Sequence, residues 1–260
     1  MTDVREVAAD LQAEQAALDA IVGALREEQW VLATPSPGWT IADQIGHLTY
    51  FDGAAALAVT DPDAFAASIG DLLAAPDAGA ALTLGRDRPP GEQLAAWREN
   101  RQRLAEVAAT LTDDQRIAWY GPSMGAKSFL TARLMECWAH GQDVVDAVGA
   151  ERAPTDRLRH IAQLGFITRS WSYKNRGMDV PEGDVRVELT SPSGAVWRYG
   201  PDDATQLVCG PAVDFCLVVT QRRHLDDTSL EVVGSLARDW MVRAQAFAGP
   251  ASDGPTPQAS

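Results

Sequence analysis

The pattern of hydrophobic positions predicts four long helices in the first 150 residues. Apolar residues recur every three to four positions in four segments, which is the spacing of a helix with one buried face. These segments are 4–30, Thr40 to about Val59, about 91–110 and about 126–148. A shorter helix followed by a loop is expected within residues 64–88, which are rich in Ala, Gly and Asp. This helix content is typical of a bundle.

Residues that break or cap helices indicate where these helices end. The sequence "TPSPGW" at 34–39 holds two prolines and a glycine, so it separates the first helix from the second. Thr40 is followed three positions later by Asp43, in the manner of a capping box, and we therefore interpret Asp43 as a helix cap rather than as a residue supporting a ligand. Gly149 is placed as the C-cap of the fourth helix.

The pattern changes character after the segment "GAERAPT" at 149–155, which we interpret as a linker. One more helix is expected over about 155–173, and the alternating sequence "VRVELTSPSGAVWRYG" at 185–200 predicts a hairpin. Further expected elements are a strand at "ATQLVCG", a helix from Pro211 to Gln221, and a short strand and last helix within 230–249. The predicted fold is mainly α: a helical bundle over 1–150, a small α+β domain over 155–249 and a disordered tail over 250–260.

Composition narrows the class of protein. The 260 residues carry a formal net charge of -14, which excludes nucleic acid and anionic membrane surfaces as partners because both require a concentrated basic surface. The start lacks the features of an export signal, and no apolar run approaches the roughly 18 residues of a membrane span. Three cysteines, Cys137, Cys209 and Cys216, make no disulfide framework. We therefore expect a cytoplasmic protein; its oligomeric state is left open.

Candidate chemistry lies on the fourth helix. Its packing stripe runs through Leu130 and Leu134, and Cys137 belongs to that stripe as a small core residue. Glu136, His140 and Asp143 fall on another side. Residues four apart on a helix lie about 5–6 Å apart, so Glu136 and His140 can offer an oxygen and a nitrogen to one ion. The alternative is a solvated polar face.

The second helix adds a third ligand. It is apolar on two sides, which predicts that it is buried and that His47 is buried with it. Trp39, just before this helix, is expected to pack as a wedge in the bundle core. His47, Glu136 and His140 together supply two nitrogens and one oxygen, and three protein ligands leave a fourth position open, as in catalytic zinc sites. Zn²⁺ is the expected metal, although Ni²⁺, Fe²⁺ and Mn²⁺ accept the same ligand set.

Two motifs resemble a known family. "PGWTIADQIGHL" at 37–48 and "LMECWAHGQDVVDAVG" at 134–149 are similar to the DinB-like metal-binding four-helix bundle of the mycothiol-dependent maleylpyruvate isomerases. The resemblance implies that His47, Glu136 and His140 hold a divalent metal. "TQRRH" and the segment after it are similar to the family's C-terminal sterol-carrier-like region. The resemblance thus covers nearly the whole chain.

The resemblance implies an enzyme that activates the thiol of mycothiol, its co-substrate, at the metal. The thiolate would add to a small electrophilic substrate, and the outcome is isomerisation if the thiol leaves again or S-transfer if the adduct is kept. Asp143 is a candidate to orient a ligand imidazole or to bind the thiol, or else a surface aspartate. Arg222 and Arg223 are candidates to bind an anionic substrate or the thiol, or else solvated arginines.

Two other functions remain open. In a metal hydrolase, metal-activated water would be the nucleophile, and Asp143 is the one candidate for its general base. In a non-catalytic binding module, the metal would be structural and the second domain would hold a ligand. The sequence leaves undecided the substrate, the metal, the choice between isomerase and S-transferase, and which arginine binds substrate.

Overall fold

The computed structural model describes residues 3–74, 88–121 and 123–258. The chain divides into two compact units, Met1–Glu151 and Arg152–Ser260. Most of the loop expected before residue 88 lies outside the described residues. Among those that are described, no helix combines the length and the apolar character that a membrane span requires.

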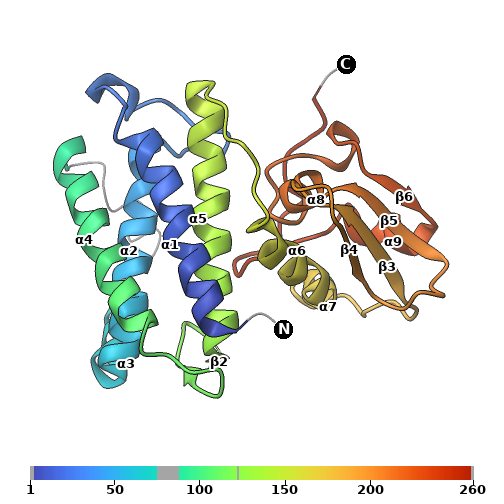
Figure 1. Ribbon diagram of the computed structural model, residues 1–260, viewed down its shortest axis with the longest axis horizontal. Helices are drawn as coiled ribbons and strands as arrows, with labels where there is room; N and C mark the ends of the chain where they lie inside the picture. The colour runs from blue at the N-terminus through green and yellow to red at the C-terminus, as the bar shows by residue number, and fades with distance from the viewer. Residues whose placement is uncertain (1–2, 75–87, 122, 259–260) are drawn as a thin grey trace. The chain divides into compact units, whose positions relative to one another are not determined.

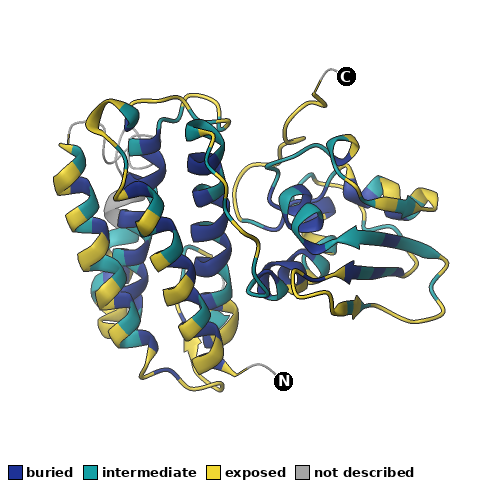
Figure 2. Ribbon diagram, turned by 45° about the horizontal axis from the view of Figure 1, so that its top comes forward, coloured by how far each residue is buried: buried dark blue, intermediate teal, exposed yellow. Residues whose placement is uncertain are grey.

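The first unit is a bundle of long helices (Figure 1). Its helices are α1 (Val4–Val22), α2 (Ile41–Thr60), α3 (Pro62–Ala74), α4 (Pro90–Ala108) and α5 (Ala126–Val148). Helix α2 packs against α4 and α5, and α1 packs against α5 and α4. Buried residues line the inner sides of these helices, and exposed residues follow their outer sides (Figure 2). The bundle predicted from hydrophobic spacing is confirmed.

Helix ends follow the expected chemistry at two places. Thr40 caps α2, and its hydroxyl and the Asp43 carboxylate bond reciprocally to each other's backbone N–H groups. Gly149 ends α5 with a left-handed φ of 62°, which glycine adopts without the strain that a Cβ imposes. The predicted cap roles of Asp43 and Gly149 are therefore confirmed.

The prediction of one helix over residues 4–30 was wrong at its C-terminal end. Helix α1 ends at Val22, with Gly23 as its cap, and only a 3-10 turn (Glu27–Gln29) follows. Glycine is a poor helix former, and the chain leaves the helix to bury Trp30. Two short strands, β1 (Arg116–Ile117) and β2 (Met124–Gly125), were not predicted, because two residues are too few to show alternation.

The second unit combines helices with one sheet. Its elements are α6 (Leu158–Ile167), α7 (Arg169–Lys174), β3 (Val185–Thr190), β4 (Val196–Tyr199), β5 (Gln206–Pro211), α8 (Ala212–Val219), β6 (Glu231–Val233) and α9 (Ser235–Met241). The strand order is β4-β3-β5-β6, with β3 and β5 parallel and the other pairs antiparallel. The β3–β4 pair is the predicted hairpin. The single helix expected over 155–173 is broken at Thr168 into α6 and α7. The predicted mainly α fold with a C-terminal α+β domain is confirmed.

The last described residues form no helix or strand, but they contact the second unit. The Ser252 hydroxyl donates to Gln221 Oε1 over 2.5 Å, and the backbone N–H of Gln258 donates to Asp227 over 3.0 Å. The expected disorder of the tail stays a prediction.

A buried carboxylate links three helices of the bundle. Asp52 of α2 accepts hydrogen bonds at Oδ2 from Gln15 Nε2 of α1, over 2.9 Å, and from Trp97 Nε1 of α4, over 3.2 Å. Its exposed fraction is 1%. Burial raises the pKa of Asp52 to about 6 even though Arg133 and these hydrogen bonds act against it. An ionised carboxylate in this position costs stability unless its partners compensate.

The Asp52→Asn substitution should change how stability depends on pH. The folded carboxyl takes up its proton near pH 6 and the unfolded one near 3.8, so acidification through this range stabilises the wild type relative to the Asp52→Asn variant. Urea unfolding of both metal-free proteins at pH 7.5 and pH 4 should show that the difference in free energy of unfolding between them shifts by about 2 kcal/mol in favour of the wild type at pH 4, where the unfolded carboxyl is itself partly protonated. A difference independent of pH would contradict the assignment of a raised pKa.

Candidate metal centre

Three candidate ligands from two helices converge inside the bundle. His47 lies in the middle of α2, and Glu136 and His140 lie one turn apart on α5, which packs against α2. The Nε2 atoms of both histidines lie 3.1 Å from the same oxygen, Oε2 of Glu136. The three donor atoms all lie within 4.8 Å of one another. Among the described residues, this is the group of histidine, cysteine and carboxylate side chains whose geometry suits a metal ion.

The cluster is largely shielded from water but not sealed. The exposed side-chain fractions are 11% for His47, 20% for Glu136 and 12% for His140. The alternative of a solvated polar face on α5 is therefore wrong: the bundle encloses this side of the helix because α2 packs against it. All three side chains therefore keep some exposure to solvent.

The protonation states of these groups favour the binding of a cation. Burial raises the pKa of Glu136, but the hydrogen bonds from His140 and His47 outweigh it and hold the pKa well below the ordinary value. Burial, together with the neighbouring His140, lowers the pKa of His47 to about 4. At neutral pH the site therefore offers a charged carboxylate and, at His47, a neutral imidazole, which are the forms that bind metals.

The residues fit a divalent metal. The Nε2 atoms of the two rings both turn toward one carboxylate oxygen, Oε2 of Glu136. Two imidazole nitrogens and one carboxylate oxygen form the set found in catalytic zinc sites. The same donors accept other first-row metals, so the geometry does not choose among them.

Asp143, the predicted supporting residue, lies on α5 just beyond His140 but outside the three-residue cluster. Its exposed fraction is 2%, so the alternative of a surface aspartate is wrong. The Ser36 hydroxyl donates to its Oδ2 over 2.9 Å, which ties the loop before α2 to α5. A role for Asp143 in binding a thiol or orienting an imidazole stays a prediction.

Trp39 lies beside the cluster rather than in the bundle core. Its ring stacks on His140 with centroids 5.7 Å apart and is tilted against His47 at 5.4 Å. The residue is half-buried. The predicted core wedge was wrong because the loop 34–39 folds back over the histidines instead of entering the core. Cys137, by contrast, is buried on the packing face, as predicted.

Gln44 is a site residue that was not predicted from the sequence. This residue lies on α2 almost one turn before His47, and its exposed fraction is 0%. Its Oε1 lies 2.5 Å from Nδ1 of His140, and its Nε2 donates to Thr34 Oγ1 over 2.8 Å. The spacing could have indicated this residue, since Gln44 and His47 are three positions apart and so share a helix face. A glutamine in a helix, however, is usually not part of a functional site.

Arg133, three residues before Glu136, was not among the site residues predicted from the sequence. Its Nη2 lies 3.8 Å from Glu136 Oε2, and its guanidinium lies 5.5 Å from the Phe51 ring centroid and 5.6 Å from that of Trp119. Only 5% of the side chain is exposed, and within the described parts of the chain Nη1 has no hydrogen-bond partner. A buried cation with an unpaired N–H group therefore lies next to the cluster. Tyr120 and Phe65 extend the aromatic packing around Phe51 and Trp119.

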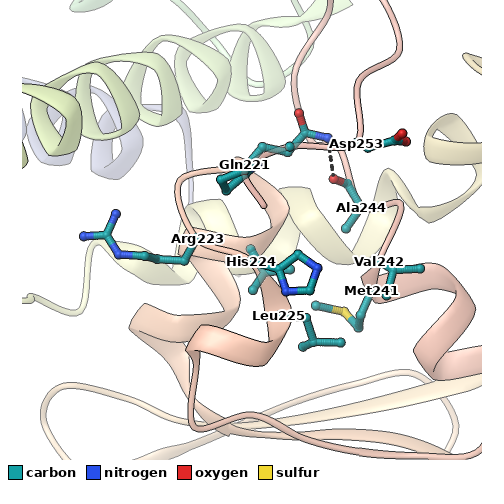
Figure 3. A pocket seen from close by; sticks show the side chains of 11 residues that line it. Gln221, Arg223, His224, Leu225, Met241, Val242, Ala244 and Asp253 are labelled. Atoms are coloured by element: carbon teal, nitrogen blue, oxygen red, sulfur yellow. Dashed lines mark hydrogen bonds between the residues drawn. The ribbon is translucent and has the colours of Figure 1, made fainter. Parts of the chain in front are cut away.

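The predicted substrate arginines belong to the second unit, directly after α8. Nη1 of Arg222 donates to the Thr220 carbonyl over 2.7 Å, and Nη1 of Arg223 donates to the Arg222 carbonyl over 2.7 Å. Arg223 also lines a small pocket with Gln221 and His224, and in Figure 3 its guanidinium extends away from the His224 ring. Roles for Arg222 and Arg223 in binding substrate or thiol stay predictions.

Comparison with known proteins matches this architecture. The family model described as the mycothiol maleylpyruvate isomerase N-terminal domain matches residues 11–145, and one described as wyosine base formation matches residues 181–232. Uncharacterized proteins from two strains of Mycobacterium tuberculosis are each 46% identical over 259 residues, covering 98% of this chain and all of theirs.

Solved structures show the same fold. Crystal structures of the mycothiol-dependent maleylpyruvate isomerase and of a histidine-to-alanine mutant of it align with TM-scores of 0.58 and 0.59 at 19% identity. Each alignment covers 91% of this chain and 97% of the other. Because the first family model covers more than half of the sequence and includes both helices of the cluster, the chain belongs to the mycothiol maleylpyruvate isomerase N-terminal domain family.

The low pKa of His47 has a measurable consequence. In the metal-free protein, the His47 ring resonances should titrate with a midpoint near pH 4, because burial and His140 disfavour the charged ring. Unfolded histidine takes up its proton near 6.5, so this residue lowers the free energy of unfolding as the pH falls from 6.5 to 4. NMR titration, with a His47→Gln variant to assign the signal, measures the midpoint. A midpoint at or above 6.5 would show that the ring is not buried as described.

Proposed function

We propose that this protein is a divalent-metal-dependent enzyme that uses a low-molecular-weight thiol, of the mycothiol type, to act on a small electrophilic substrate. The observation that carries the proposal is the convergence of His47, Glu136 and His140 in a partly open site. Membership of the mycothiol maleylpyruvate isomerase N-terminal domain family supports the choice of thiol. Zinc is the metal that we propose first, because two imidazoles and a carboxylate suit it.

The proposed ligands have distinct duties. His47 and His140 supply neutral nitrogens, and Glu136 supplies the negative charge that partly offsets that of the cation. A divalent metal held there would lower the pKa of a thiol bound beside it, so that a thiolate is available at neutral pH. The side chains around the site, including Trp39 and Phe51, exclude water and so keep the thiolate reactive.

The fate of the thiol adduct separates two activities. If the thiolate adds to a conjugated double bond, the new single bond can rotate, and loss of the thiol then gives the other geometric isomer. If the adduct is kept, the product is an S-conjugate. We propose that Asp143 contacts the thiol and that Arg222 and Arg223 meet anionic parts of the thiol or the substrate.

Two other functions use the same three ligands. A metal hydrolase would activate water and would need a general base, and Asp143 is buried and already accepts a hydrogen bond from Ser36. A binding module would keep a metal without turnover. Thiol-dependent turnover separates the proposed enzyme from both, since a hydrolase works without added thiol.

The His140→Ala variant should lose the metal. Elemental analysis of the purified wild type is expected to give one divalent ion per chain, and the variant much less, because one nitrogen ligand is gone. Mycothiol should raise the melting temperature of the wild type only when metal is present. His160→Ala, which changes a buried histidine of the second unit, is the control. Equal metal content in the wild type and His140→Ala would remove the ligand assignment.

The Arg133→Met variant should bind zinc more tightly. A guanidinium 3.8 Å from the ligand oxygen of Glu136 repels a bound cation, so its removal should lower the dissociation constant roughly tenfold, the equivalent of about 1.4 kcal/mol. The metal-free variant should be less stable than the wild type by a few kcal/mol (~3–5), because buried carboxylates lose their cation.

Competition with a chromophoric chelator measures the affinity of the Arg133 variants, and urea unfolding measures their stability. Arg133→Lys keeps the charge and should resemble the wild type in zinc affinity. Weaker zinc binding by Arg133→Met than by Arg133→Lys would contradict the electrostatic account.

A further inference from the structure

The two candidate histidine ligands differ at the nitrogen that faces away from Glu136. Nδ1 of His140 lies 2.5 Å from Gln44 Oε1. Nδ1 of His47 is buried and has no hydrogen-bond partner among the residues that the structure describes. An imidazole nitrogen can bind a metal only if it carries no proton. The hydrogen-bond partner of the other nitrogen therefore decides which tautomer is present and which nitrogen can bind the metal.

A chain of hydrogen bonds fixes the proton on His140. The backbone carbonyl of Trp39 can only accept, and the Thr34 hydroxyl donates to it over 3.0 Å. The Thr34 oxygen is then free to accept from Gln44 Nε2, over 2.8 Å. This orients the glutamine amide so that Oε1, which can only accept, faces His140 Nδ1. Nδ1 must therefore carry the proton.

With a proton held at Nδ1, Nε2 is the nitrogen of His140 that can bind a metal, and the metal would replace the hydrogen bond that Nε2 donates to Glu136 in the metal-free protein. Nε2 of His140 points to Glu136 Oε2, the oxygen that also faces His47. The series of hydrogen bonds begins at a backbone carbonyl, which can only accept. This sets the direction of each hydrogen bond that follows. Trp39 also stacks on the His140 ring, so the loop 34–39 contacts this ligand directly by ring packing and is joined to it through Gln44 by hydrogen bonds.

We propose that Gln44 is a positioning residue for the metal site, which selects the His140 tautomer with Nδ1 protonated and so presents Nε2 to the metal. The proposal rests on the proposed function in that it needs a metal at the site. Gln44 is not itself a ligand, because its Oε1 contacts the far side of the ring. Gln44 connects His140 to the loop before α2. Nδ1 of His47 has no comparable hydrogen-bond partner among the described residues.

The test compares three variants for zinc affinity and for the state of the His140 ring. Gln44→Leu removes the acceptor and should weaken zinc binding about 10- to 100-fold, the range for partners that orient metal ligands. Gln44→Glu restores an acceptor for Nδ1–H and should keep the affinity near that of the wild type. Gln93→Leu is the matched control, because Gln93 is also buried in the bundle, with 0% exposure, and donates to Thr49 of α2 instead.

Two measurements decide the outcome. Chelator competition with zinc alone gives the dissociation constant of each variant, after circular dichroism has confirmed that the variant is folded. Long-range proton–nitrogen NMR of the zinc-loaded wild type should show a hydrogen on Nδ1 of His140 and zinc at Nε2.

Wild-type affinity in Gln44→Leu, or zinc bound at Nδ1 of His140, would overturn the role of Gln44 and leave the metal site intact. If Gln93→Leu weakened zinc binding as much as Gln44→Leu, the effect would be one of bundle packing and the role would also be rejected. Absence of zinc binding by the wild type would instead reject the proposed function itself.

Discussion

One carboxylate oxygen, Oε2 of Glu136, holds the site together. Both histidine rings and the Arg133 guanidinium turn toward this atom. These contacts offset the cost of burying its negative charge. A charged carboxylate inside a helical bundle is costly unless several donors share it. Here the two imidazoles offset burial and keep its pKa well below the ordinary range. The bundle therefore holds a negative charge at a position that is only partly shielded from water.

Two layers of contacts support this arrangement. On one side, Gln44, Thr34 and Trp39 hold His140 from behind. On the other, Arg133 lies against Phe51 and Trp119 and brings positive charge close to the ligands. A buried guanidinium beside the ligands can stabilise negative charge in this poorly solvated site.

The sequence predicted the fold class and the Glu136–His140 pair because both depend on local spacing, whereas His47 was added from the predicted burial of its helix and from the resemblance to a known family. Helical periodicity located α2 and α5, and the interval of four residues placed Glu136 and His140 on one side of α5. It could not predict the end of α1 at Val22, since burial of Trp30 is a tertiary effect. The contacts of Gln44 and Trp39 with His140 join segments about 100 residues apart, and no periodicity reports such a pair.

X-ray absorption spectroscopy of the zinc-loaded protein tests the central claim most directly, because it reports the atoms bound to the metal. The account predicts a first shell of nitrogen and oxygen neighbours at about 2.0–2.1 Å, with the multiple-scattering signature of two imidazoles. Adding a low-molecular-weight thiol should bring one sulfur neighbour at about 2.3 Å. A shell without imidazole, or one that contains sulfur before thiol is added, would contradict the assignment of His47, Glu136 and His140.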